Sequence, residues 1–379
     1  MKKFFLLLLV LFISYFSWPL VEKQLDKLPF GMEIVNLKSE IDAGIAETDY
    51  AVAIDSFFDE IHQFLVILND TIDRTPNETR ENPTQIAKPD LAAPTKQIFS
   101  IHNIELGEAK VNVDKVLGVE KRSSFNEYGL EWFTYHENYQ NFLMVAFDKK
   151  NNVASLYTNQ DLISSTKGIK IGTPKDLVRN KLGKPLTKLE KESVLFNFNK
   201  DADFDVYFMS NSYVTIFYDK HQENTVTSLQ IIAKEAEQNK RDVYTEASPE
   251  LLEGFEYQLF DLTNATRVKH GLSTLTWNDH VKQTARKHSL DMAKNDYFAH
   301  ENLDGKSPFD RMQEDNLLFS FAGENLAYGQ FSSIFAHEGL MNSLGHRENI
   351  LRSEFQFLGV GVAFNSESQP YYTENFYAK

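Results

Sequence analysis

The sequence contains no cysteine among its 379 residues. Disulfide bonds and thiolate metal sites are therefore excluded, and any bound metal ion would need histidine nitrogens and carboxylate oxygens as ligands. Basic residues are also in the minority, with 39 Lys and Arg against 54 Asp and Glu, which gives a formal net charge of −15. Because an acidic chain repels phosphate backbones, we expect no nucleic-acid partner.

Apolar residues, in contrast, are plentiful. Hydrophobic residues make up 42% of the chain, with 30 Phe and 16 Tyr, which is enough for buried cores and excludes wholesale disorder. The chain is also longer than one ordinary domain, so we expect two or three.

The chain opens with Lys2 and Lys3, followed by an apolar run from Phe4 to Leu20. Two cations before such a run are typical of a signal peptide. No small-x-small cleavage site follows, and Trp18 is suited to anchor the run at a membrane interface. We therefore predict an uncleaved signal anchor, a transmembrane segment over residues 1–20, in a single-pass protein of the cell membrane with extracellular C-terminal domains. The alternative is secretion after signal cleavage.

Two segments separate this anchor from the rest of the chain. Residues 21–68 include apolar side chains at three- and four-residue spacing between Ile54 and Leu68, which predicts a membrane-proximal helical segment. Residues 69–97 contain four prolines among polar residues, a composition typical of an extended linker.

Residues 98–235 contain an internal repeat, with copies at about 105–165 and 170–233. Two glycines bracket the same 12-residue span in each copy, at Gly107 to Gly118 and at Gly172 to Gly183, and strand-like sequence follows. This pattern predicts a short helix with a C-cap glycine and then antiparallel strands, built twice. The two copies could pair their sheets or pack face to face. No titratable cluster recurs, which favours a structural or partner-binding module over an active site.

A charged linker at 236–250 leads to a last domain at 251–379, in which helices and strands intermix. One amphipathic helix includes Phe255, and a second follows Asn278, a suitable N-cap residue. The chain ends with a predicted hairpin over 357–378. Together these elements predict an α+β fold.

Three polar residues of this last domain lie in loop-like positions that burial alone does not explain: His300, Glu324 and His346. Two neutral imidazoles and a carboxylate form a suitable set of ligands for a divalent cation with positions left for water. Each residue also has a structural interpretation, since Glu324 could brace backbone amides and His346 could cap a helix. Their spacing alone matches no short metal motif.

The residues around these three positions form ordered motifs. In chain order they are Phe298-x-His300, Gly323-Glu324-Asn325-Leu326-Ala327, Gly345-His346-Arg347-x-Asn349-Ile350-Leu351 and Tyr372-Thr373-Glu374-Asn375-Phe376. Residues 255–379 thereby resemble the bacterial form of the CAP superfamily, also called SCP/PR-1-like. The repeat domain resembles the CAP-associated N-terminal domain of Bacillus-type surface proteins. The resemblance implies an α-β-α sandwich with a wide cleft, in which two histidines and acidic residues can bind zinc or another divalent cation.

Matched to the family, His300 and His346 are similar to its two cleft histidines, and Glu324 to its first cleft glutamate. Many relatives have a second glutamate in a following helix, but Ser343 stands at that position here. Glu338 lies nearby in sequence as a substitute, although its spacing differs. The resemblance therefore implies three metal ligands at most, with water completing the site.

Two function hypotheses follow. We favour a cell-surface module that binds a ligand or protein partner of the cell envelope and has a divalent-metal cleft. The alternative is a zinc-assisted extracellular hydrolase of the peptidase or esterase type, with Glu324 and His346 as catalytic residues, in which Glu324 activates a zinc-bound water. The missing second glutamate favours the binding module, and the sequence leaves open whether the chain is an enzyme.

Overall fold

The computed structural model describes residues 85–190, 195–198 and 202–379. The predicted anchor, the membrane-proximal segment and the first part of the linker therefore lie outside the described residues. Within the described ranges, no helix is long and apolar enough to cross a membrane.

The end of the predicted linker is held against the repeat domain. Residues 85–97 form no helix or strand. The carboxylate of Glu105 accepts hydrogen bonds from the backbone N–H groups of Lys96 and Gln97 at 2.8 and 2.7 Å. Asn103 accepts a further one from Ala92 at 2.8 Å. The chain is thus fixed before its first strand begins.

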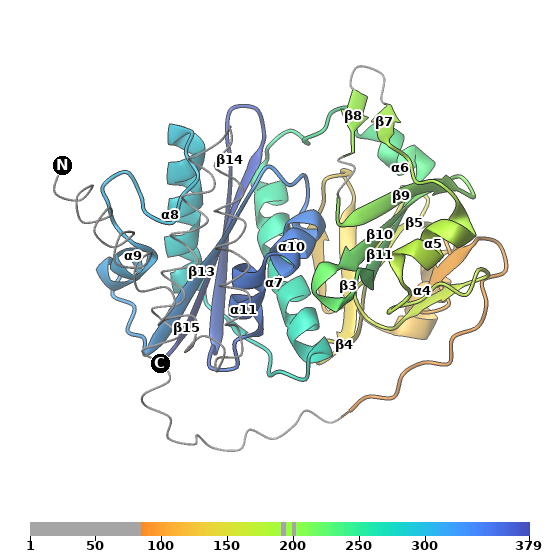
Figure 1. Cartoon of the computed structure of the whole chain (residues 1–379), viewed down its shortest axis with the longest axis horizontal. Helices are drawn as coiled ribbons and strands as arrows, with labels where there is room; N and C mark the ends of the chain where they lie inside the picture. Colours follow the sequence, from red (N-terminus) through yellow and green to blue (C-terminus); the bar gives the residue numbers. More distant parts are fainter. Residues whose placement is uncertain (1–84, 191–194, 199–201) are drawn as a thin grey trace, which may run out of the picture. The chain divides into compact units, whose positions relative to one another are not determined.

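The two copies of the repeat pair edge to edge in one antiparallel sheet of seven strands (Figure 1). In spatial order the strands are β2 (Arg122–Phe125), β3 (Glu131–Glu137), β4 (Gln140–Phe147), β5 (Val153–Thr158), β11 (Thr225–Ala233), β10 (Ser212–Asp219) and β9 (Phe204–Met209). The copies meet where β5 pairs with β11, with Leu156 opposite Ile231.

Each copy begins with the predicted helix. These helices are α4 (Lys110–Leu117) and α5 (Lys175–Leu182). Gly118 and Gly183 follow them with φ of 75° and 85°, a region that glycine adopts without steric cost. The predicted helix-then-strands unit is therefore confirmed in both copies.

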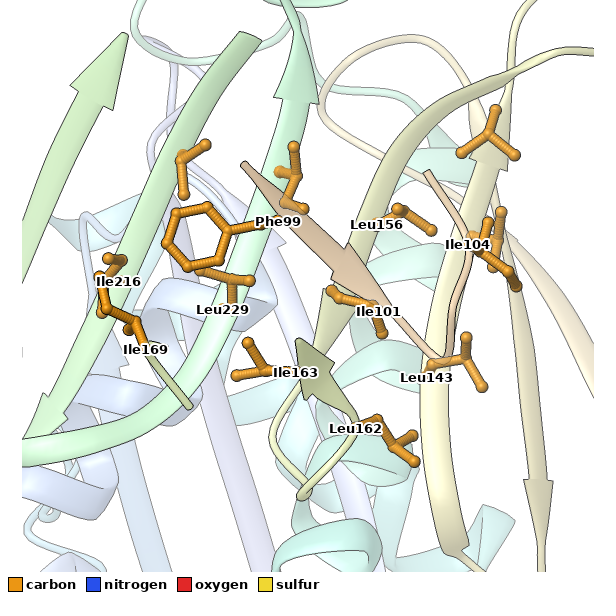
Figure 2. Packing of buried hydrophobic residues seen from close by; sticks show 14 of the residues in the cluster. Phe99, Ile101, Ile104, Leu143, Leu156, Leu162, Ile163, Ile169, Ile216 and Leu229 are labelled. Carbon is orange, nitrogen blue, oxygen red and sulfur yellow. The ribbon is translucent and has the colours of Figure 1, made fainter. Parts of the chain in front are cut away.

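One face of the seven-stranded sheet forms the core of the repeat domain. A two-stranded ribbon of β1 (Phe99–Ile101) and β6 (Ile163–Ser165) crosses this face. Figure 2 shows Ile101 and Ile163 of the ribbon among Leu143, Leu156 and Leu229 of the large sheet. The remaining pieces of this domain are the hairpin of β7 (Lys188–Glu190) and β8 (Leu195–Asn197), the 3-10 turn η1 (Lys220–Gln222) and helix α6 (Lys234–Asn239).

The opposite face of the same sheet packs on the C-terminal domain. Because side chains alternate along a strand, Met144 of β4, Tyr157 of β5 and Ile232 of β11 point to this second face. They share a buried cluster with residues of α7 (Pro249–Lys269) and α10 (Ser333–Asn342): Leu262, Ala265 and Ile334. Part of the predicted linker at 236–250 belongs to α6, whose Ala236 is buried in this cluster.

The C-terminal domain has three layers. Its mixed sheet runs in the order β12 (Thr276–Trp277), β14 (Phe357–Phe364), β15 (Pro370–Ala378) and β13 (Phe321–Tyr328). Helix α8 (Asp279–Asn295) lies on one side of the sheet, and α7, α10 and α11 (Leu344–Leu351) lie on the other (Figure 1). Helix α9 (Pro308–Glu314) packs beside α8. This is the predicted α-β-α arrangement, and β14–β15 is the predicted terminal hairpin.

Strand β14 shows how the sequence separates the two helix layers. Val360 and Val362 point toward α7 and join its core. Gly359 and Gly361 face α8, where the helix backbone comes very close. A Cβ atom added to Gly361 would lie 2.0 Å from the backbone nitrogen of Arg286. Only glycine fits this approach.

We therefore expect Gly361→Ala to destabilise the protein strongly, at or above the upper end of the ~1–3 kcal/mol that overpacking costs. Gly339→Ala is the matched control, because Gly339 lies in α10 with open space around its Cα. That change is expected to stabilise by about 0.5–1 kcal/mol through helix propensity. Urea unfolding of both variants measures the difference, and equal stability of the two would contradict this account.

Candidate functional site

The three predicted site residues meet at the free edge of the four-stranded sheet. Glu324 lies on β13, the outer strand. His300 follows α8 on one side of the sheet, and His346 lies in the first turn of α11 on the other. Charge on His300 contributes to lowering the pKa of His346, as expected for neighbouring rings. The sheet edge is therefore where the loop after α8 and the first turn of α11 converge from the two helix layers.

Glu324 is buried and its two carboxylate oxygens are both engaged. His300 Nδ1 lies 2.9 Å from Oε1, and Arg311 Nη2 donates to Oε2 at 2.6 Å. Burial alone would raise the pKa of Glu324, but the hydrogen bond from His300 and the charge of Arg311 outweigh it and lower the pKa. Glu324 is consequently an ionised group that holds its two partners in place.

Arg311 is a site residue that the sequence interpretation missed. It lies on α9, whose start is fixed by a capping box between Ser307 and Asp310. Its guanidinium also donates to the backbone carbonyls of His300 at 2.7 Å and Lys306 at 3.0 Å. One side chain thus joins the loop that bears His300 to the carboxylate of Glu324. In the sequence, Arg311 belongs to the ordered motif Asp304-Gly305-x-x-Pro308-Phe309-x-Arg311-Met312, which does not by itself indicate the contact with Glu324.

His346 forms a separate pair with Ser343. Its Nδ1 lies 2.8 Å from Ser343 Oγ. Burial, together with the charge of His300, lowers the pKa of His346 to about 4, so the ring is neutral at physiological pH. Ser343, which stands where a second glutamate was expected, orients this imidazole through a hydrogen bond.

A buried polar network supports the site from beneath. Asn325 Nδ2 donates to the backbone carbonyl of His346 and to Glu374 Oε2, both at 3.1 Å. Thr263 of α7 donates to the other oxygen of Glu374 at 2.8 Å. Burial raises the pKa of Glu374 to about 7. Asn349 Nδ2 donates to Asn325 Oδ1 at 3.0 Å, so α11 is tied to the sheet. The motif residues of this region therefore position the two site pairs.

Glu338 is not a substitute ligand. It is buried in the interface with the repeat domain, where its Oε1 accepts hydrogen bonds from Tyr157 at 2.7 Å and Ser228 at 2.6 Å. The face of α10 that carries Glu338 packs on the seven-stranded sheet, so the side chain points away from His346. His288 of α8 is a buried core histidine, with Nε2 3.0 Å from the backbone carbonyl oxygen of Ala299.

The three predicted metal ligands are brought to one place, but their geometry does not fit a metal ion. Among the residues that the structure describes, no group of three or more His, Asp or Glu side chains is arranged to hold one. Both oxygens of Glu324 are already committed, and the Arg311 charge beside Oε2 would repel a cation. Metal binding therefore remains a prediction without support from the side-chain arrangement.

Exposed apolar side chains flank both histidines. Phe298 and Leu344 each stand two residues before a site histidine, and each is 46% exposed. The Phe298 ring also contacts Tyr328 of β13, with centroids 5.9 Å apart. Large apolar groups around buried polar ones are typical of a binding surface.

The comparisons with known proteins agree with this fold. Residues 260–376 match the CAP family, described as the cysteine-rich secretory protein family, and residues 106–243 match the CAP-associated N-terminal family. The chain therefore carries a CAP domain preceded by a CAP-associated N-terminal domain. Among individual relatives, it is similar to two Bacillus subtilis proteins.

The first, named "Uncharacterized membrane protein YlbC", is 28% identical over 327 residues, which cover 81% of this chain and 90% of that protein. The second, named "Uncharacterized protein YkwD", is 37% identical over 135 residues, which cover 36% of this chain and 51% of that protein. The match to YkwD thus spans about half of its length.

Two solved structures share the fold. One is an extracellular protein containing an SCP domain from Bacillus anthracis, with a TM-score of 0.63 and 23% identity, covering 81% of this chain and all of that one. The other is a cysteine-rich secretory protein from Staphylococcus aureus, with a TM-score of 0.60 and 17% identity, covering 76% and 95%. The predicted CAP-like domain behind a sheet domain is thereby confirmed.

Removing Arg311 is expected to destabilise the protein. Arg311→Met leaves Glu324 with a buried charge and one partner, which we expect to cost about 3–5 kcal/mol at pH 7. Without Arg311, burial should raise the pKa of Glu324 above its ordinary 4.5. The stability deficit should then begin to shrink as the pH falls through this raised pKa, because the carboxyl group of the variant becomes protonated. Urea unfolding from pH 7 to pH 4 measures this. Adding Glu324→Gln should recover part of the loss, and a deficit independent of pH would argue against the charge pair.

The neutral state of His346 can be observed directly. Because the pKa in the folded protein lies near 4, the ring signals should stay unchanged as the pH falls through 6.5 and shift only near pH 4. Histidine-selective NMR, assigned with His346→Gln, measures the titration. The lowered value also means that stability linked to this ring is full above pH 6.5 and declines between pH 6.5 and 4. A midpoint near 6.5 would contradict the burial of the ring.

Proposed function

We propose that the chain is a membrane-attached binding protein of the cell envelope, whose CAP domain holds its ligand at the edge of β13. The observation that carries the proposal is that every polar group of the site is held in place by another side chain. His300, Glu324 and Arg311 form one hydrogen-bonded set, and His346 and Ser343 form a second. Such preorganised groups suit recognition, because little side-chain freedom is lost when a ligand binds.

The flanking side chains indicate the chemistry of the ligand. Phe298, in the loop that bears His300, and Leu344, at the start of α11 near His346, offer apolar contact. The neutral ring of His346 offers hydrogen bonding without charge. A ligand with apolar groups beside amide or hydroxyl groups would match both. Polymers of the cell envelope built from sugars and short peptides have this composition, and we propose one as the ligand.

The location follows from the sequence and the relatives. The chain begins with cations and an apolar run, which is typical of a signal anchor. YlbC is named a membrane protein, and the similar Bacillus anthracis structure is titled an extracellular protein. These three observations support a single-pass protein whose CAP domain faces the outside of the cell.

The hydrolase alternative would require the hydrogen bonds of Glu324 to rearrange. A zinc-assisted mechanism would need Glu324 to activate a water molecule. Its two oxygens instead accept hydrogen bonds from His300 and Arg311, and Arg311 holds the carboxylate as a weak base. The binding function requires no such rearrangement, and for that reason we prefer it.

The test uses the detergent-solubilised full-length protein and fluorescently labelled, soluble peptidoglycan fragments, with binding followed by fluorescence anisotropy. We expect Phe298→Ser and Leu344→Ser each to weaken binding about tenfold or more, because a buried Leu or Phe side chain contributes about 1.5–3 kcal/mol. Leu177→Ser is the matched control, since Leu177 of α5 is 41% exposed but lies in the other domain.

Two further measurements separate binding from hydrolysis. A chelator is expected to leave the anisotropy unchanged, and the fragments should be recovered intact. Zinc-dependent cleavage that is lost in His300→Ala and His346→Ala would replace our proposal with the hydrolase. Equal affinity of the wild type, Phe298→Ser and Leu344→Ser for the fragments would also contradict the proposed binding site.

A further inference from the structure

A hollow lies where the two domains meet, on the sheet face that α7 and α10 leave uncovered. Its floor belongs to the seven-stranded sheet and includes Val206 of β9, Thr215 of β10 and Gln230 of β11. Its walls are aromatic rings from both domains: Phe196, Phe198, Phe331 and Phe335. None of the site residues His300, Glu324 and His346 lines it.

The walls form a continuous set of ring contacts across the domain boundary. Phe196 of the β7–β8 hairpin lies 5.8 Å from Phe331 of the C-terminal domain, and Phe331 lies 4.2 Å from Phe335 of α10, measured between ring centroids. The hollow encloses about 620 Å³ with its open mouth included. That figure includes open solvent, so it is an upper bound on the space that a ligand could occupy.

One buried polar group has no partner in this apolar setting. Gln230 is 1% exposed, and its Nε2 donates no hydrogen bond to any described residue. An unpaired buried donor destabilises a fold, so it is normally satisfied. Gln230 lines the hollow, although its Nε2 atom is itself covered, so an oxygen of a ligand would accept this hydrogen bond after a rotation of the Gln230 side chain toward the hollow.

The lining of the hollow also includes charged residues of both signs. Lys240 lies over the ring of Phe331, 4.9 Å from its centroid, and over that of Tyr128 at 5.7 Å. Glu237 also lines the hollow, so neither sign dominates. The recognised oxygen is therefore that of a carboxylate or of an ester carbonyl group, either of which a neutral amide donor suits, rather than that of a more strongly anionic phosphate or sulfate.

We propose that this hollow is a second binding site, which takes the acyl group of a small carboxylic acid or of its ester. The carboxylate or ester carbonyl oxygen accepts the hydrogen bond from Gln230, and the hydrocarbon chain packs against the aromatic walls. The space open to the centre of a water-sized sphere is about 50 Å³, roughly four times what one water needs. A short chain with its end at the mouth fits this space. The site does not depend on the function proposed above.

The test exploits the absence of cysteine from the native chain. Val243→Cys places one thiol at the half-buried rim of the hollow, in the full-length protein in membranes. Hexanoic acid and methyl hexanoate are the probes, and the rate of alkylation by a maleimide is the readout. We expect the probes to slow alkylation severalfold. Val119→Cys, at an 81% exposed position outside the hollow, should react at an unchanged rate.

A second variant tests the hydrogen bond. Gln230→Leu keeps the size of the side chain, removes the unpaired donor and is expected to raise the unfolding temperature. When Gln230→Leu is combined with Val243→Cys, the protection of the thiol from alkylation by the probes should become roughly fivefold to tenfold weaker. Protection by the acid alone or by the ester alone identifies which form binds.

Thr215→Cys, on the floor of the hollow, places the thiol at a second position for the same alkylation measurement. The proposal is overturned if neither compound protects either position, or if protection survives Gln230→Leu undiminished.

Discussion

The packing of helix α7 between two sheets is the constraint on which the rest of the structure depends. One side of α7 covers Val360 and Val362 of the C-terminal sheet, and the other covers the repeat domain. Its buried Asp261 accepts hydrogen bonds from Arg122 and Tyr139 of that domain, both at 2.9 Å. Desolvation of this carboxylate, which raises its pKa, is thus offset in part by a charge and a hydroxyl group of the other domain. The CAP domain and the repeat domain therefore share one core.

The local elements were predictable because their signals are local, whereas this shared core was not. Apolar periodicity and cap residues predicted the repeat helices, α8 and the terminal hairpin, since each depends on residues close in sequence. Helix α7 resembles an ordinary one-sided amphipathic helix, because polar residues such as Asp261 and Gln258 occupy what looks like its solvent face. Both are buried through partners more than a hundred positions away in the chain. Periodicity does not report such partners, and Glu338 was misplaced for the same reason.

The site shows the same division between local and tertiary information. Family motifs located His300, Glu324 and His346, and the structure brings them to one sheet edge. The motifs did not reveal that Glu324 would be neutralised by Arg311, because that pairing depends on how α9 docks beside β13. From the sequence alone, a carboxylate grouped with two histidines indicates a cation site. The same carboxylate with a guanidinium at 2.6 Å is a structural anion.

Two features of the site act in the same direction, and one of them, Ser343, departs from the family pattern. Ser343 removes a negative charge from the expected metal site and hydrogen-bonds to His346 instead, and burial keeps that imidazole neutral. Glu324, the remaining acidic group, has its charge balanced by Arg311. A divalent cation at this edge would therefore meet little net negative charge, while losing its hydration shell would cost as much as in any other site. The balance of charge, more than the identity of any one ligand, weakens the attraction of this edge of the CAP domain for a divalent cation.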